Sequence, residues 1–281
     1  MLQPSFRIHQ EGLENADMSG AHLLIDAGPL HFAFGILHLP LKKFIAFEFY
    51  QLKPASKEED LEELLKENPL LAHSFKDVLI AFNTRESVLI PAELYKKEDA
   101  ETMLSMIHGD LHTGLILQEH VSGMDIYNIY QVPGFLHKAL SGRFSNGHYW
   151  HVYSTILKIM HERKNDLPAS YIHVSFYPNQ VIVAVMQDGV CQLLQTFLYD
   201  IPEDVSYHLL NITEQFEIDN ATIPLILSGL IDKGSALYAE LLKYYLQVKA
   251  DTGGNMFTID PAFESYPEHF FTPVFSLALC E

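Results

Sequence analysis

The chain has 281 residues, of which 36 are acidic and 18 basic, giving a formal charge of −18, and 48 % are hydrophobic. This composition supports a sizeable folded core and excludes a disordered, collagen-like or coiled-coil chain. An acidic chain without a basic stripe repels phosphate backbones, so we expect no nucleic acid partner. Two cysteines, Cys191 and Cys280, are too few for a disulfide framework or a four-thiolate zinc site.

Two further patterns bear on where the protein works. The first twenty residues contain no apolar stretch of the length that a signal peptide needs. No run of eighteen apolar residues occurs, so we expect no membrane insertion. The expected location is therefore the cytoplasm.

The first half of the chain predicts a meander of three strands followed by alternating helices and strands. The three apolar runs, at 22–25, 31–38 and 44–52, are separated by turn-like segments. A helix is expected next, because Ser56 and Glu59 form a capping box before a leucine-rich face. The remaining expected elements of this half are strands at 78–82, 87–90, 115–118 and 126–130, and helices at 100–107 and 153–160.

The second half repeats this order. Strands are expected at 171–175, 181–186 and 190–198, and the pair Asp188-Gly189 is a strong hairpin signal between the last two. A helix, a short strand at 223–227 and another helix follow. The two meanders start roughly 150 positions apart, the scale of one domain. The repeat favours a duplicated α/β architecture of mixed sheets, with a cleft between two lobes.

The charge distribution supports a boundary between the halves. Residues 1–166 carry 22 acidic and 15 basic side chains, whereas residues 167–281 carry 14 and 3. The change falls at a polar turn, Asn165-Asp166-Leu167-Pro168. We therefore expect an N-terminal tail at 1–20, a first lobe at 21–166 and a second lobe at 167–281.

Two glycine-containing turns resemble nucleotide-binding elements of one superfamily. Leu24-Ile25-Asp26-Ala27-Gly28, followed by the strand from Phe32 to Ile36, resembles the first phosphate loop of the actin/sugar-kinase/chaperone ATPases. Leu225-Ile226-Leu227-Ser228-Gly229 resembles the strand and turn that contact adenosine in that fold. The resemblance implies a two-lobed, ribonuclease-H-like α/β fold.

A narrower resemblance covers most of the chain after residue 20. The stretches Thr196–Tyr199, Glu203–Tyr207 and Leu237–Leu241 resemble a bacterial family of unknown function that is assigned an actin-like ATPase fold. The nearest functionally described relatives in that fold are the actin-like pilus-assembly proteins of the PilM type. The resemblance thus implies the fold without implying an activity.

The resemblance places Asp26, Gly28, Ser228 and Gly229 at a nucleotide cleft. In the fold, backbone N–H groups cradle phosphates while acidic side chains hold magnesium waters. The second loop, His173 to Tyr177, lacks the acidic residue and the glycine, and its bulky aromatic side chains are expected to obstruct phosphate. A vestigial site without nucleotide is therefore the favoured hypothesis. From the residues alone, Asp26 is equally explained as a turn residue, and for Gly28 a turn role is favoured.

The string His108-Gly109-Asp110-Leu111-His112-Thr113-Gly114 looks like the catalytic loop of aminoglycoside-phosphotransferase-type kinases. Leu115 stands where that loop has a magnesium-binding Asn, and no Gly-rich loop precedes it. A zinc or iron site on His108, Asp110 and His112 is a further hypothesis, but no H-E-x-x-H motif supports it. The simplest explanation is the end of a helix at Gly109.

These observations give three hypotheses. The first is a non-catalytic interaction or scaffold protein that binds an unknown protein partner, with no catalytic residue, metal or cofactor. The alternative is a weak ATPase of the same fold that binds ATP and Mg²⁺ through Asp26 and backbone amides. The remote alternative is a small-molecule kinase that uses Asp110.

Overall fold

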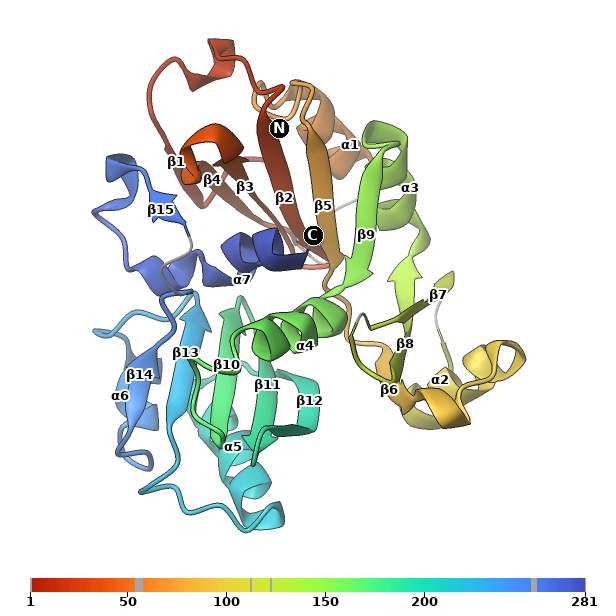
Figure 1. Ribbon diagram of the computed structural model, residues 1–281, viewed down its shortest axis with the longest axis vertical. Helices are drawn as coiled ribbons and strands as arrows, with labels where there is room; N and C mark the ends of the chain where they lie inside the picture. Colours follow the sequence, from red (N-terminus) through yellow and green to blue (C-terminus); the bar gives the residue numbers. More distant parts are fainter. Residues whose placement is uncertain (1, 54–57, 112, 122, 254–256, 281) are drawn as a thin grey trace. The chain divides into compact units, whose positions relative to one another are not determined.

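The computed structural model describes residues 2–53, 58–111, 113–121, 123–253 and 257–280. Its secondary structure is mixed α/β (Figure 1). The strands are β1 (Phe6–His9), β2 (Ala21–Gly28), β3 (His31–His38), β4 (Lys43–Gln51), β5 (Asp77–Phe82), β6 (Ser87–Pro91), β7 (Gly114–His120), β8 (Ile126–Pro133), β9 (Gly147–His151), β10 (Tyr171–Tyr177), β11 (Gln180–Gln187), β12 (Val190–Leu198), β13 (Leu225–Gly229), β14 (Val248–Ala250) and β15 (Thr258–Ile259). The helices are α1 (Glu58–Glu67), α2 (Ala100–His108), α3 (Gly134–Arg143), α4 (Val152–Glu162), α5 (Pro202–Gln215), α6 (Ala236–Leu241) and α7 (Thr272–Phe275). No helix within the described ranges is long and apolar enough to cross a membrane.

The chain divides into two compact units. Unit 1 comprises Met1–Ile159, Phe257–Phe263 and Val274–Glu281, and unit 2 comprises Met160–Met256 and Glu264–Pro273. This division differs from the expected single boundary after residue 166, because two C-terminal segments belong to the first unit. The structure also differs from the expected tail at 1–20, because these residues contain β1, which pairs with β4.

An aromatic contact explains why the last residues belong to unit 1. The ring of Phe275 stacks on Phe44 with centroids 3.7 Å apart. Gly35 makes room for it, because a Cβ there would lie 2.7 Å from Phe275 Cε1. A contact between residues so far apart in the chain leaves no local pattern in the sequence.

The main sheet of unit 1 has the order β1-β4-β3-β2-β5-β9, with β15 also paired to β4. The expected meander forms β2, β3 and β4, and its first hairpin closes at the pair Gly28↔His31. Alternate residues of β2, β3 and β5 face a core that α1 and α3 complete, as the 2-residue period of a strand requires. The expected capping residue Ser56 lies outside the described residues, whereas the expected helix face is confirmed by buried Leu61, Leu64 and Leu65.

A smaller antiparallel sheet of unit 1 has the order β6-β8-β7. Its core consists of Ile90 and Ile129 from the sheet and Ala100 and Leu104 from α2. The helix ends where the sequence predicts, because Gly109 adopts φ 72° and its N–H donates to the Ser105 carbonyl.

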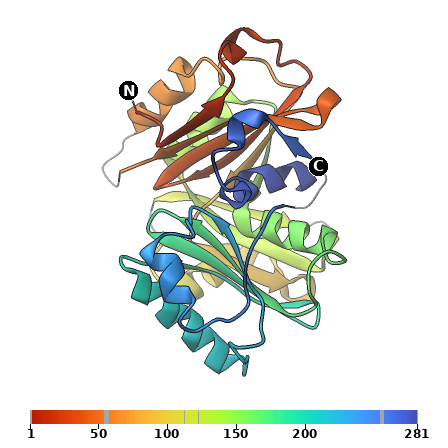
Figure 2. The same cartoon turned by 90° about the vertical axis from the view of Figure 1, so that its left-hand side faces the viewer.

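The sheet of unit 2 has the order β12-β11-β10-β13-β14. The second expected meander is confirmed as β10, β11 and β12, and Asp188 and Gly189 both have positive φ in the turn between the last two strands. Helices α5 and α6 lie on the same side of this sheet (Figure 2). They pack against the apolar residues of β10, β11 and β13, which form the core of the unit.

Candidate functional site

The predicted phosphate-loop residues of unit 1 lie at one edge of its main sheet. Strands β2, β5 and β9 run parallel to one another, so their carboxyl ends meet at the same edge. Ligands of open α/β sheets commonly bind at such an edge. The chain places Asp26 and Gly28 at the end of β2, Asn83 after β5, and His151 at the end of β9.

Asp26 is buried, with 1 % of its surface exposed, and its carboxylate is held by other side chains. His31 Nε2 lies 2.8 Å from Asp26 Oδ1, and Asn83 Nδ2 donates to the same oxygen at 3.1 Å. The His31 ring in turn stacks on Phe49, with centroids 5.9 Å apart. Two groups of the protein thus bind one oxygen, Oδ1, of this carboxylate.

Gly28 is required by a close approach of two chain segments. A Cβ at this position would lie 2.5 Å from the Asn83 carbonyl oxygen and 3.0 Å from His31 Cε1. Its φ lies outside the left-handed region, and the turn itself is formed by Pro29 and Leu30. Asp26 is likewise inside β2, where it pairs with Ala33. Asp26 thus lies within the strand, whereas Gly28 is the strand residue that directly precedes the turn.

His151 extends this buried polar cluster. Its ring lies 2.9 Å from the Thr84 carbonyl oxygen through Nε2, and Nδ1 accepts a hydrogen bond from the Tyr153 N–H at 3.1 Å. These partners define a neutral ring with the proton on Nε2. Burial lowers the pKa of His151 to about 3, although the Thr84 hydrogen bond and the charge of Asp26 oppose the shift. The imidazole is therefore neutral near pH 7.

A carboxylate lies next to His151 on the small sheet. Glu119 accepts hydrogen bonds from the His151 backbone N–H at 2.9 Å and from the Tyr130 hydroxyl at 3.2 Å. Burial raises the pKa of Glu119, while hydrogen bonds from Ser154, His151 and Tyr130 oppose the rise. The acid thus anchors the end of β9 to the small sheet.

The predicted adenosine-turn residues lie in unit 2, on β13. Ser228 is buried and forms a hydroxyl–hydroxyl hydrogen bond of 3.0 Å with Ser175 on β10. Gly229 has φ 77°, and a Cβ there would fall well inside van der Waals contact of the Phe176 carbonyl oxygen. The glycine is therefore required both by its backbone conformation and by the close approach of β10.

The second predicted loop is a regular strand, β10. Phe176 points into the core of unit 2, where it is fully buried. The expectation that aromatic side chains here obstruct phosphate does not hold for Phe176, because alternation along the strand turns its ring to the face covered by α5 and α6. For Tyr177 it stays a prediction. Residues Ser175 and Tyr177 point to the opposite face.

Unit 2 contains a buried ion pair that the sequence patterns do not predict. Arg163 binds the Asp251 carboxylate in a bidentate manner, with Nη1–Oδ2 and Nη2–Oδ1 distances of 3.1 and 2.9 Å. His173 Nε2 lies 3.2 Å from Asp251 Oδ2, and the Thr272 hydroxyl donates to the Asp251 carbonyl at 2.8 Å. Burial alone would raise the pKa of Asp251, but His173 and Arg163 hold it well below its ordinary value. No sequence signal links these residues, because 88 positions separate Arg163 from Asp251.

The kinase-like string shows no assembled catalytic group. Asp110 is exposed just after the end of α2, and His108 Nε2 lies 3.0 Å from the Ser87 carbonyl oxygen. His112 lies outside the described residues. Among the residues that are described, no three His, Cys, Asp or Glu side chains are placed to hold a metal ion.

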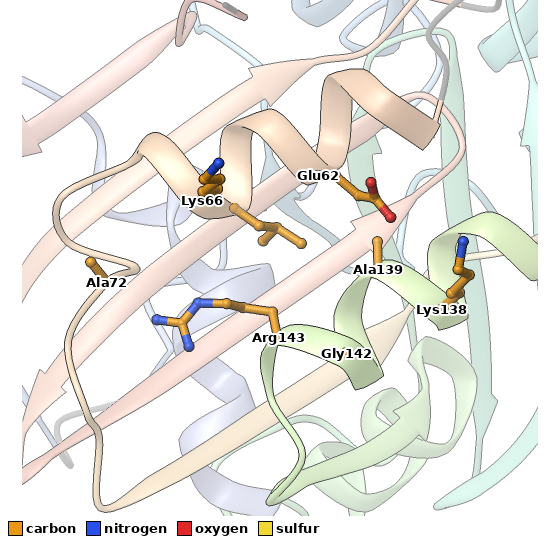
Figure 3. Close-up of a pocket in the computed structure, with 8 residues that line it drawn as sticks. Glu62, Lys66, Ala72, Lys138, Ala139, Gly142 and Arg143 are labelled. Carbon is orange, nitrogen blue, oxygen red and sulfur yellow. The ribbon is translucent and has the colours of Figure 1, made fainter.

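A groove of about 470 Å³ lies between α1 and α3 in unit 1, away from the predicted residues (Figure 3). Its floor is apolar, and Lys66, Lys138 and Arg143 contribute positive charge to its rim. Lys138 forms an ion pair of 2.5 Å with Glu58, and Arg143 donates to the Leu71 carbonyl. Two of the three cations are thus already used within the protein, so the groove does not form a dedicated anion site.

The arrangement of the strands is similar to that of several solved structures. A protein of unknown function with an actin-like ATPase fold from Bacteroides thetaiotaomicron gives a TM-score of 0.73 at 20 % identity, covering 85 % of this chain and 93 % of that chain. The PilM–PilN type IV pilus biogenesis complex gives 0.58 at 11 % identity, covering 92 % and 96 %. The cytoplasmic domain of EpsL, an inner membrane component of the type II secretion system of Vibrio cholerae, gives 0.50 at 11 % identity, covering 93 % and 95 %.

These likenesses show that the protein has an actin-like ATPase fold, as the sequence predicts. No curated protein matches the sequence. The model of one family, described as a protein of unknown function (DUF3822), matches residues 11–248. The chain therefore belongs to the DUF3822 family.

Proposed function

We propose that this protein is a non-catalytic member of the actin-like fold that acts by binding another protein. The observation that carries the proposal is the state of Asp26. Its carboxylate is buried and its Oδ1 is already bonded by His31 and Asn83, so the group is poorly placed to organise the water shell of Mg²⁺. A protein that has lost nucleotide chemistry retains the surfaces of the fold as its means of action.

Two further observations support this proposal. In unit 2, the strand β10 offers Ser175 where a phosphate loop would need an acid and a glycine, and its hydroxyl is bonded to Ser228. The structurally similar PilM is part of a complex with PilN. That likeness concerns the fold, and we extend to this chain only the general idea of a protein partner.

The competing function is weak binding and hydrolysis of ATP with Mg²⁺. It is favoured by the position of Asp26 and Gly28 at the carboxyl edge of parallel strands, where ligands of α/β folds bind. Under this alternative, His31 and Asn83 would have to release Asp26 when Mg-nucleotide binds.

Isothermal titration calorimetry with ATP and ADP, each with and without Mg²⁺, separates the two functions. We expect no heat of binding and no thermal shift at millimolar nucleotide. A matched variant, His31→Gln, removes the imidazole that binds Asp26 Oδ1 and keeps a polar side chain at this position. We expect this variant to bind no nucleotide either. Magnesium-dependent binding that disappears in Asp26→Asn would overturn the proposal and establish the ATPase alternative.

A further inference from the structure

The edge strands of the three sheets differ in how well they resist pairing with another strand. Natural sheets protect their edges with short strands, charged residues, proline or bulges. Strands β1, β6, β9 and β14 have five residues or fewer, and β7 contains Glu119. Strand β12, at the edge of the unit 2 sheet, has nine residues, Val-Cys-Gln-Leu-Leu-Gln-Thr-Phe-Leu, without a charge, a proline or a glycine.

The regular part of β12 is long enough to pair with a further strand. Its pairing with β11 is continuous from Gln180↔Leu198 to Val185↔Leu193, and the register shifts only beyond that point. The bulge therefore leaves Leu193–Leu198 as a straight run, about 20 Å long at the usual rise per residue. Gln195 and Leu198 on this run are exposed. Among the described strands, only β11 pairs with β12.

Acidic residues at the two ends of β12 indicate which kind of partner segment would bind there. Exposed Asp188 precedes the strand, and exposed Asp200 and Glu203 follow it. No lysine or arginine occurs between Lys164 and Lys233. The edge is thus uncharged in its middle and acidic at both ends, in a region without compensating cations. A complementary segment would be uncharged in its middle and basic at its ends.

We propose that β12 is a docking edge for an extended segment of a partner protein, with β-forming residues at its centre and lysine or arginine at both ends. The segment adds as a further strand, so backbone hydrogen bonds supply affinity and the basic ends supply specificity. This inference deepens the proposed function, on which it rests, by naming the chemistry of the partner.

A second copy of this chain fits the same edge poorly. Antiparallel pairing of Leu193–Leu198 with its own copy would bring the start of one β12, preceded by Asp188, near the end of the other, followed by Asp200. Like charges placed close together oppose association, and the net charge of −18 adds to the repulsion. A basic-ended segment of another protein avoids both costs.

Two synthetic peptides test the proposal with the full chain. One has a Val-Thr-Val-Thr-Val-Thr centre flanked by two lysines on each side, and the other has the same centre flanked by glutamates. Fluorescence anisotropy is expected to show binding of the lysine-flanked peptide, about tenfold tighter than the glutamate-flanked one. N-methylation of the peptide amides on one alternating set is expected to weaken binding about tenfold, and methylation of the other set to leave it unchanged, because only one set faces β12.

A matched pair of variants locates the interaction. Gln195→Lys adds a lysine at the centre of β12, and natural edge strands use such a charge to resist pairing. We therefore expect the lysine-flanked peptide to bind about fivefold more weakly. Gln247→Lys adds the same charge to an exposed glutamine before β14, at the opposite edge of the sheet, and binding is expected to stay unchanged. Melting temperatures of both variants establish that each is folded.

The outcomes separate this inference from the proposed function. Absence of peptide binding, or binding that N-methylation does not alter, would overturn the docking edge. Dimers of the free chain in sedimentation velocity that Gln195→Lys dissociates would overturn the assignment to another protein in favour of a second copy. Neither result depends on nucleotide binding, whereas Mg-ATP binding would overturn the non-catalytic proposal and leave the edge intact.

Discussion

Two buried aspartates, one in each unit, are stabilised in different ways. Asp26 in unit 1 is bonded by His31 and by the neutral amide of Asn83, without an arginine or lysine among these two partners. Asp251 in unit 2 is bonded at both oxygens by Arg163 and also lies beside His173. The second carboxylate is thus tied to a permanent cation, and its pKa is lowered, whereas the first is held by groups that need not carry charge.

The origin of the partners differs as well. His31 and Asn83 come from the hairpin and the strand beside Asp26, so the cluster completes one sheet edge. Arg163 and Asp251 are 88 positions apart and join the beginning of unit 2 to the residue after its last strand, β14. The comparison teaches that the partners of a buried acid decide its role, since Asp26 completes one edge of a sheet whereas Asp251 joins two distant segments of its unit.

The largest expected effect comes from breaking the charged pair. Asp251→Ala leaves the Arg163 guanidinium buried without its carboxylate, and we expect a loss of about 3–5 kcal/mol in the free energy of unfolding. Asp26→Asn keeps a polar group beside His31 and Asn83, and we expect a loss of about 1 kcal/mol. Urea denaturation at pH 7 measures both losses.

The double variant Arg163→Met with Asp251→Leu serves as the control for this comparison. It removes both charges, so its loss is expected to be smaller than that of Asp251→Ala alone. Equal losses for Asp251→Ala and Asp26→Asn would contradict the distinction between the two aspartates.

The sequence predicts both meanders because period-2 patterns and turn residues are local. The Asp188-Gly189 pair, for example, requires positive φ at both positions, and both have it. The end of α2 at Gly109 is likewise predicted from neighbouring residues alone. By contrast, β9 has no recognisable pattern of its own and is defined by its pairing with β5, from Val78↔Gly147 to Phe82↔His151. Strand β1 is fixed similarly by pairing with β4, where Arg7 forms an ion pair with Glu48.

The candidate site follows the same rule. The sequence identifies Asp26 and Gly28 through a local motif, but the reasons for them lie in Asn83, more than fifty positions away. The bond between Arg163 and Asp251 and the return of Phe275 to Gly35 depend entirely on tertiary contacts. Such pairs cannot be predicted from residue spacing, because the two partners lie far apart in the chain.

The glycines that end β2 and β13 sharpen the comparison of the two units. Gly229→Ala combines left-handed strain with a clash against the Phe176 backbone, and we expect a loss of about 3 kcal/mol in the free energy of unfolding. Gly28→Ala meets the Asn83 carbonyl oxygen and the His31 ring but adds no left-handed strain, and we expect a loss of about 1–2 kcal/mol. Urea denaturation of both variants measures the difference.

Gly189→Ala measures how much left-handed backbone strain alone lowers the free energy of unfolding. This glycine has φ 79° and open space around it, so the variant pays the left-handed strain without a clash, about 1–2 kcal/mol. A Gly229→Ala loss no larger than that of Gly189→Ala would show that β10 can move away from β13.

The His151 ring beside the Asp26 cluster is expected to make the stability depend on pH. Burial lowers its pKa to about 3 in the folded protein, while an unfolded histidine titrates near 6.5. Between these values the unfolded state binds more protons, so the free energy of unfolding falls as pH falls, by about 2 kcal/mol from pH 7 to pH 5. Asp251 does not contribute in this window, because its unfolded pKa is about 3.9 and its folded pKa is lower.

Variants at two histidines measure this contribution by urea denaturation between pH 5 and 7. In His151→Gln, the side chain cannot titrate, so we expect a lower free energy of unfolding at pH 7 but a shallower pH dependence, reduced by about 2 kcal/mol across the window. His120→Gln, at an exposed position on the small sheet, is expected to retain the wild-type slope, because it leaves the His151 ring and its hydrogen bonds in place. An unchanged slope in His151→Gln would mean that the ring binds as many protons in the folded as in the unfolded protein across this window. A steeper rise of the free energy of unfolding with pH would mean that the ring is protonated in the folded protein, and Asp26 would then lie near a charged partner as Asp251 does.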